Sequence, residues 1–259
     1  MLTPPPNPLP IHREGESSEH ALIETRDLVK AYGLLPVLRK INVQIQRGEF
    51  VALLGPNGSG KSTLLRQLAG LSKPTAGQIL VGGWSLPDEA DAVRAQIGLV
   101  SHKPLLYENL TARENLRFFA KLYGLAGDER EQRIDSLLKQ VGLYKRGFDL
   151  VRTYSRGMLQ RLSIARALLH EPDVLLFDEP YTGLDQDAAT VLDDLLITAH
   201  ESGRTIVMAT HQLERARRLA SRVVILSRGG VVYDDVMEHI ARAQLAAIYS
   251  DATSMAAAR

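Results

Sequence analysis

Residues 55–63 have the composition of a phosphate-binding loop. They follow an apolar run, 50–54, and precede a helix-like run, 64–69, with Gly70 where that helix would end. A strand, a glycine-rich loop and a helix in this order form a P-loop, whose backbone N–H groups and helix dipole hold phosphate oxygens. The sequence therefore predicts a nucleoside triphosphate site formed by Gly55, Pro56, Asn57, Gly58, Ser59, Gly60, Lys61, Ser62 and Thr63.

Two side chains of this loop are placed to act on the phosphates directly. Lys61 would reach the terminal phosphates, and the Ser62 hydroxyl would ligate Mg²⁺. A glycine turn without a ligand is the alternative interpretation. The spacing arises by chance in on the order of one chain of this length in a hundred, and the flanking strand and helix lower that figure, so phosphate binding is favoured.

Two adjacent carboxylates end another apolar run, 174–177, which has the composition of a central strand in a parallel sheet. Asp178 would hold the Mg²⁺ water shell beside Ser62. Glu179 would orient or deprotonate a water that attacks the γ-phosphate. An exposed acid pair at a strand end is the alternative, and the preceding P-loop disfavours it.

A histidine and a tyrosine are further candidates. His211 follows the strand-like run 205–209, at the sheet edge where ligand groups gather in parallel sheets. Taken alone, a histidine is more often structural. Tyr32 precedes the loop in the sequence and would either stack on a nucleotide base or pack beside a turn, and spacing does not separate these two roles.

The distance between the motifs requires an insertion. Lys61 and Asp178 are 117 positions apart (178 − 61), whereas one βαβ unit needs about 30 residues. The chain between them has a capping-box sequence at 111–114 and a helical pattern at 128–141. We therefore expect an α/β domain, with a mixed or parallel sheet flanked by helices and a helical insert at about 102–168.

The composition is ordinary for a globular chain: 45% of the 259 residues are apolar, 24% are charged and the net charge is +1. This balance gives no indication of a nucleic-acid partner. Cysteine is absent, which excludes disulfides and thiolate metal sites. No run is long and apolar enough for us to expect direct membrane insertion. We expect residues 1–20 to be a disordered proline-rich tail and the chain from Asp251 to be loose.

Together these motifs resemble those of the nucleotide-binding subunits of ABC transporters, and the resemblance covers about residues 22–233. The matching segments are Walker A at 55–63, Walker B at 174–179, the base-stacking aromatic at Tyr32, the D-loop with Asp185, and the switch histidine at His211.

The signature motif of the same family, usually Leu-Ser-Gly-Gly-Gln, corresponds to residues 154–161. Ser155 and Gly157 are kept, whereas Arg156 and Met158 depart from the usual residues. Variants of this kind occur among exporter subunits of the family.

The resemblance implies an ABC-type P-loop NTPase fold, with an antiparallel β subdomain and an inserted α-helical subdomain. It implies one ATP-binding domain at 21–240, followed by a short C-terminal extension at 241–259. ATP and Mg²⁺ would be the ligands, and ATP would be hydrolysed. Two identical or related subunits would form a head-to-tail dimer, in which Walker A of one copy and Ser155 and Gly157 of the other enclose ATP. The dimer would drive integral-membrane subunits from the cytoplasmic face of the cell membrane.

One position departs from the family in an informative way. Val100-Ser101-His102 stands where the Q-loop usually reads Val-Pro-Gln. His102 could accept a hydrogen bond from a Mg²⁺-bound water or respond to the γ-phosphate, and its charge could vary near neutral pH. Together with the segments 110–118, 154–158 and 181–185, this replacement resembles the ATP-binding subunit of the haem exporter of cytochrome c biogenesis.

Three other functions are weighed against this one. The ATPase subunit of another exporter, for lipid, drug or polysaccharide, would differ in its membrane partner, which is expected to dock between His102 and Tyr123. A soluble ABC-type ATPase acting on ribosomes or DNA usually has two cassettes or a coiled-coil insert, and this sequence shows neither. The signature segment and the absence of an Asn-Lys-x-Asp sequence argue against a P-loop kinase or GTPase.

Overall fold

The computed structural model describes residues 21–101, 103–241 and 243–257. The predicted proline-rich tail and His102 lie outside these residues. Six of the described strands form one sheet, whose order is β10 (Gly230–Val236), β9 (Arg222–Ser227), β3 (Phe50–Leu54), β8 (Thr205–Ala209), β7 (Val174–Asp178) and β6 (Ile97–Val100).

The apolar runs of the sequence are the inner strands of this sheet. β3, β8 and β7 are buried along their whole length and pair in parallel, and only β10 runs antiparallel to its neighbour. Successive residues of β3 alternate between two apolar cores, with Phe50 and Ala52 in one and Val51 and Leu53 in the other. Both faces of the sheet are therefore covered, which explains why these strands lack polar alternation.

A second sheet is antiparallel throughout. Alternating polarity in its outer strand buries Ile41, Val43 and Ile45 and exposes Asn42 and Gln44, the pattern of a sheet with one solvated face. Its order is β2 (Leu35–Ile45), β1 (Ile23–Tyr32), β4 (Ala76–Val81) and β5 (Trp84–Leu86).

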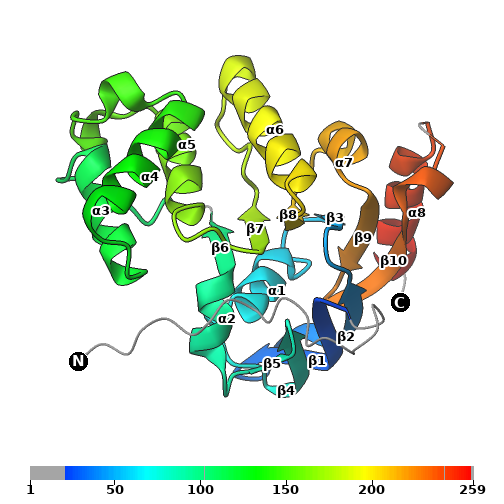
Figure 1. The fold of residues 1–259 in the computed structure, drawn as a ribbon. Helices are drawn as coiled ribbons and strands as arrows, with labels where there is room; N and C mark the ends of the chain where they lie inside the picture. The colour runs from blue at the N-terminus through cyan, green and yellow to red at the C-terminus, as the bar shows by residue number, and fades with distance from the viewer. Residues whose placement is uncertain (1–20, 102, 242, 258–259) are drawn as a thin grey trace.

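Helix α1 (Lys61–Leu68) packs between the two sheets (Figure 1). Its Leu64, Leu65 and Leu68 join the apolar core that includes one face of each sheet. Because α1 directly follows β3, this packing places the start of the helix at the carboxyl edge of the six-stranded sheet. A short helix, α2 (Ala90–Gln96), leads into β6.

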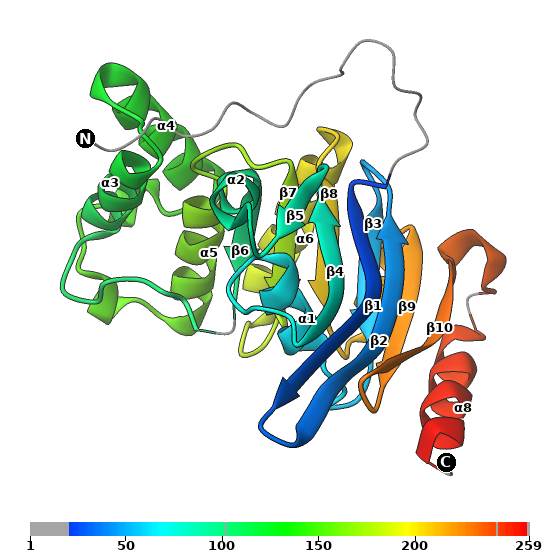
Figure 2. The ribbon, with the colours of Figure 1, turned by 90° about the horizontal axis from the view of Figure 1, so that it is seen from below.

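Among the described residues, three α-helices lie between β6 and β7 in the sequence, where the helical insert was expected: α3 (Ala112–Leu122), α4 (Gly127–Gln140) and α5 (Arg156–Ala167). The predicted capping box is confirmed, since Thr111 Oγ1 accepts from the Glu114 N–H at 3.2 Å and the Glu114 carboxylate accepts from the Thr111 N–H at 2.7 Å. Figures 1 and 2 show α3 and α4 at one end of the molecule. The boundaries of a subdomain at 102–168 stay a prediction.

The remaining α-helices of the described chain are α6 (Gln186–Glu201), α7 (Leu213–Leu219) and α8 (Leu245–Ala257). The expectation of loose chain from Asp251 is wrong for residues 251–257, because they continue α8. Ile248, Tyr249 and Ala252 pack against the larger apolar core, and the alanine-rich sequence has high helix propensity. None of the helices among the described residues has the length and apolar character needed to cross a membrane.

Candidate active site

Two glycines of the loop between β3 and α1 lie so close to other residues of the protein that a side chain at either position would make a close contact. A Cβ on Gly55 would lie 2.2 Å from the Leu226 carbonyl oxygen, and a Cβ on Gly60 would lie 2.7 Å from Leu38 Cδ2. Both glycines also have positive φ angles, 147° and 107°, which residues with a Cβ rarely adopt. Any other residue at Gly55 would displace the backbone, and any other residue at Gly60 would strain the loop and require the Leu38 side chain to move.

Helix α1 starts at this loop without a capping side chain. Its N-cap, Gly60, offers none, and the first N–H groups of a helix have no acceptor within the helix. The helix start borders a pocket of about 190 Å³, lined by Val37, residues 57–63 and Glu179. The buried Ser59 hydroxyl in this lining has no hydrogen-bond partner among the described residues. A phosphate group would supply the missing acceptors.

Lys61 brings a positive charge to the pocket. Its ammonium donates to the carbonyl oxygens of Gly55 at 2.7 Å and Pro56 at 3.2 Å and lies 4.0 Å from Glu179 Oε1. Burial lowers the pKa of Lys61, and the charges of Glu179 and Asp178 partly oppose this shift. An anionic ligand in the pocket would add a further counter-charge and favour the protonated amine.

Ser62 and Asp178 connect the start of α1 to the end of β7. The Ser62 hydroxyl donates to Asp178 Oδ1 at 2.8 Å, and Asp178 is buried as the last residue of its strand. Hydroxyl and carboxylate oxygens suit Mg²⁺, which usually takes one or two protein ligands together with phosphates and water. The part of the chain that the structure describes has no group of three or more metal-binding side chains. The pair therefore fits a magnesium ion held jointly with a nucleotide.

Glu179 contacts His211 at the sheet edge. His211 Nδ1 lies 2.8 Å from Glu179 Oε2, and the ring donates this hydrogen bond because a carboxylate only accepts. The Glu179 N–H donates to the Ala209 carbonyl at 2.9 Å, at the end of β8. Glu179 has a φ of 52°, a strained value for a residue with a side chain. This backbone carries its carboxylate to the loop, between Lys61 and His211.

Tyr32, the proposed base-stacking residue, ends β1 and is 51% exposed. The Lys30 ammonium lies 5.0 Å from the centre of its ring and donates to the Lys73 carbonyl at 2.7 Å. Tyr32 is not among the described residues that line the loop pocket. This exposure is compatible with base stacking and with packing beside a turn, so base stacking stays a prediction.

Ser155, Gly157 and Asp185 gather at the adjoining starts of α5 and α6. Ser155 Oγ accepts from the Met158 N–H at 3.3 Å, and Asp185 Oδ1 accepts from the Ala188 N–H at 2.8 Å. A Cβ on Gly157 would lie 3.2 Å from Ala188 Cβ, so the two helix starts are in close contact. Among the described residues, none of the three lines the pocket at the loop of the same chain.

The structure adds a second glycine turn to the site, between β9 and β10. The Gly229 N–H donates to the Ser59 carbonyl at 3.1 Å, and a Cβ on Gly229 would lie 2.4 Å from the Val37 carbonyl oxygen. The turn between β9 and β10 thus supports the phosphate loop from one side. No local pattern indicates this contact, because its partners are far apart in the sequence.

Comparisons with known proteins agree with this geometry. The family model described as ABC transporter matches residues 38–182. The linearmycin resistance ATP-binding protein LnrL of Bacillus subtilis is 35% identical over 211 residues, which are 82% of this chain and 68% of that protein. The Nod factor export ATP-binding protein I of Cupriavidus pinatubonensis is 38% identical over 209 residues, which are 81% of this chain and 64% of that protein.

A solved structure shows the same architecture. The dimeric, post-hydrolysis structure of the ATP-binding cassette MJ0796, bound to ADP and Pi, matches with a TM-score of 0.78 and 31% identity over 83% of this chain and 98% of that one. This likeness confirms the predicted fold, an α/β P-loop NTPase with a mixed sheet, an antiparallel sheet and flanking helices. The chain belongs to the ABC transporter family and is an ATP-binding domain of that family.

Proposed function

We propose that this chain binds and hydrolyses ATP as the subunit that powers an ABC exporter. The observation that carries the proposal is the position of Glu179. Its carboxylate borders the loop pocket, 4.0 Å from Lys61 Nζ and 2.8 Å from His211 Nδ1. A proton acceptor thus lies beside a pocket with the backbone geometry of a phosphate site.

In the proposed reaction, backbone N–H groups of the loop and α1 hold the β- and γ-phosphates. Lys61 turns from the Gly55 carbonyl to these phosphates. Glu179 accepts a proton from the water that attacks the γ-phosphorus, and the bond from that phosphorus to the β-phosphate oxygen breaks to give ADP and phosphate. His211 orients the Glu179 carboxylate and contacts the γ-phosphate.

Two further groups complete the ligand set. Mg²⁺ bound by Ser62 and Asp178 would neutralise charge on the phosphates as they separate. Tyr32 would stack on the adenine, which agrees with its exposure.

A second subunit is part of the proposal. Ser155 and Gly157 lie at the start of α5, and neither lines the loop pocket of the described chain. The MJ0796 structure is dimeric and holds ADP and Pi. A head-to-tail dimer would bring this helix start, and Asp185 beside it, to the nucleotide of the partner subunit. The positive end of the α5 dipole would then favour closure while the γ-phosphate is present.

Integral-membrane subunits are the proposed partners, with this chain at the cytoplasmic face of the cell membrane. The segment expected to dock them, 103–123, exposes several large apolar side chains. Leu105 is 53% exposed and Leu122 is 66% exposed, and Tyr107 and Phe118 are exposed as well. Contiguous exposed apolar patches mark protein contacts, and we propose that these side chains form such a contact.

Two export functions are weighed for the whole transporter. The names of the two relatives, a linearmycin resistance protein and a Nod factor export protein, favour an exporter of the resistance or export type. Neither name supports haem export. The haem-export prediction therefore rests only on His102 and the motif segments given above, and the alternative exporter is the preferred assignment.

Binding of ATP to the Lys61→Ala variant tests the phosphate assignment. A charge-assisted hydrogen bond contributes about 1.5–3 kcal/mol, so the Kd for Mg-ATP should rise about ten- to hundredfold. Lys73→Ala, which removes an exposed lysine outside the pocket, is the matched control and should bind as the wild type does. Equal affinities for the wild type and Lys61→Ala would contradict the assignment.

A pull-down from detergent-solubilised membranes of the source organism tests the transporter role. Tagged Glu179→Gln protein with Mg-ATP should retain polytopic membrane subunits. A Soret absorption band in the eluate would support haem export, and a permease without that band would support the alternative exporter. Recovery of ribosomes or DNA without any membrane subunit would instead identify a soluble ABC-type ATPase.

A further inference from the structure

A buried carboxylate contacts the segments that follow Glu179 and His211. Asp193, on α6, is 4% exposed. It accepts hydrogen bonds from the Tyr181 hydroxyl at 2.5 Å and from Arg215 Nη1 at 2.5 Å, and Arg218 donates to it as well. The Arg215 guanidinium also lies over the Tyr181 ring, 4.3 Å from its centre. We refer to Asp193, Tyr181 and Arg215 as the Asp193 cluster.

Each member of the Asp193 cluster depends on the others. A buried carboxylate is stable only when it is paired and hydrogen-bonded, and here two guanidinium groups and a hydroxyl satisfy it. Burial raises the pKa of Tyr181 to about 12, so the hydroxyl keeps its proton at neutral pH and donates. Removal of one partner therefore perturbs the geometry of the remaining two.

The Asp193 cluster joins the two segments that carry the candidate catalytic pair. Tyr181 comes two residues after Glu179, and Arg215 comes four residues after His211. The same segments meet at the site itself, where His211 donates to Glu179 at 2.8 Å. The connection through Asp193 is buried. The connection between His211 and Glu179 is at the surface, since the His211 side chain is 58% exposed.

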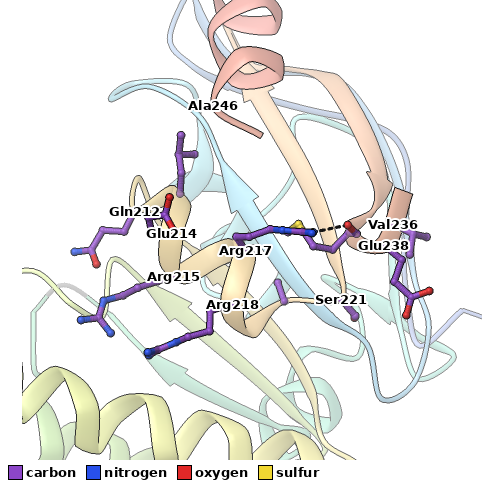
Figure 3. Close-up of a pocket in the computed structure, with 12 residues that line it drawn as sticks. Gln212, Glu214, Arg215, Arg217, Arg218, Ser221, Val236, Glu238 and Ala246 are labelled. Atoms are coloured by element: carbon purple, nitrogen blue, oxygen red, sulfur yellow. Dashed lines mark hydrogen bonds between the residues drawn. The ribbon is translucent and has the colours of Figure 1, made fainter. Parts of the chain in front are cut away.

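Figure 3 shows that the arginines of α7 extend to opposite sides of the helix. Arg215 and Arg218 extend to one side of the helix, the side on which they reach Asp193. Arg217 extends to the opposite side and donates to the Met237 carbonyl at 2.6 Å. Helix α7 is therefore anchored on two sides. This anchoring fixes the position of the segment just before the helix, which includes His211.

We propose that the Asp193 cluster is a positioning device that sets the approach of His211 to Glu179 and thereby the rate of ATP hydrolysis. This inference rests on the proposed function of that pair. Tyr181 and Arg215 do not line the loop pocket among the described residues, so they act through the position of His211 relative to Glu179 and leave ATP binding unchanged.

The test is the ATPase activity of purified Tyr181→Phe, which loses only the hydroxyl and keeps the ring beneath Arg215. We expect kcat to fall about tenfold, because small misplacement of a catalytic group has effects of this order or larger. The Kd for Mg-ATP should stay within about twofold of the wild type. Tyr233→Phe is the matched control, since its hydroxyl also donates to a carboxylate, Asp235 Oδ2 at 3.2 Å, in β10. This control should keep wild-type kcat.

A double-mutant cycle separates positioning from a general loss of structure. In a His211→Ala background, Tyr181→Phe should lower the residual single-turnover rate by less than about twofold, because the group it positions is gone. Asp193→Asn should behave in the same way as Tyr181→Phe. Equal losses with and without His211, or an unchanged kcat in Tyr181→Phe, would overturn the inference.

The same assay distinguishes failure of the inference from failure of the proposed function. If the wild type hydrolyses ATP and His211→Ala is slower, but Tyr181→Phe is not, only the positioning role is wrong. If the wild type does not hydrolyse ATP, or His211→Ala is as fast as the wild type, the proposed reaction itself is wrong.

Discussion

Replacing Glu179 with Gln separates ATP binding from ATP hydrolysis at this site. The amide keeps the size of the side chain but can neither accept the proton of the attacking water nor carry the negative charge. A positioned general base contributes about 10²- to 10⁴-fold to a rate, which corresponds to about 3–5 kcal/mol in the activation free energy. We therefore expect kcat to fall by at least about a hundredfold.

The same substitution should not weaken ATP binding. Glu179 Oε1 lies 4.0 Å from Lys61 Nζ, so the carboxylate attracts the ammonium that the phosphates need. Two charges at this distance interact by about 4 kcal/mol at an effective dielectric constant of 20, and exposure of Glu179 to solvent reduces this to about 1 kcal/mol. The Kd for Mg-ATP should accordingly be equal to that of the wild type or up to about fivefold lower.

Phosphate release, nucleotide titration and size-exclusion chromatography with Mg-ATP measure these effects, and the variant should accumulate as an ATP-held dimer. Glu171→Gln is the matched control, because Glu171 has the same φ of 52° but pairs with Arg133 away from the pocket. This control should hydrolyse ATP as the wild type does. Turnover of Glu179→Gln within about threefold of the wild type would refute its role as the base.

Three further predictions address other parts of the structure. Ser62→Ala should raise the Mg²⁺ concentration for half-maximal ATPase activity about tenfold or more, and an unchanged Mg²⁺ titration would argue against Ser62 as a ligand. Tyr32→Ala should weaken ATP binding about tenfold but leave inhibition by tripolyphosphate unchanged, because stacking involves only the base. Burial lowers the pKa of His170 from 6.5 to about 4. Between these two pH values the unfolded chain binds more protons than the folded chain, so the free energy of unfolding falls as the pH drops from 6.5 to about 4. His170→Phe keeps an aromatic ring at the position where His170 stacks 3.9 Å from Tyr123. In urea unfolding, the free energy of unfolding of this variant should fall by about 3 kcal/mol less than that of the wild type between pH 7 and pH 4.

Local patterns were sufficient for the elements that form the loop pocket. The apolar runs before Gly55 and before Asp178 became fully buried strands, because a parallel sheet covered on both faces selects for such runs. The Thr111–Glu114 capping box formed as expected, since its two hydrogen bonds join residues three positions apart. The last helix, α8, was missed because its alanine-rich sequence has no clear polar face, and packing against the core stabilises it.

The amino-acid sequence specifies which groups are available for phosphate, Mg²⁺ and a water nucleophile, and the order in which the chain presents them. Which of these groups come into contact depends on the fold. Three contacts join residues from different elements. They are the hydrogen bond from Ser62 to Asp178, the contact of Glu179 with His211, and the Asp193 cluster. Their proximity follows from strands β3, β7 and β8 lying side by side, and that pairing is set by the burial of apolar residues along the whole chain.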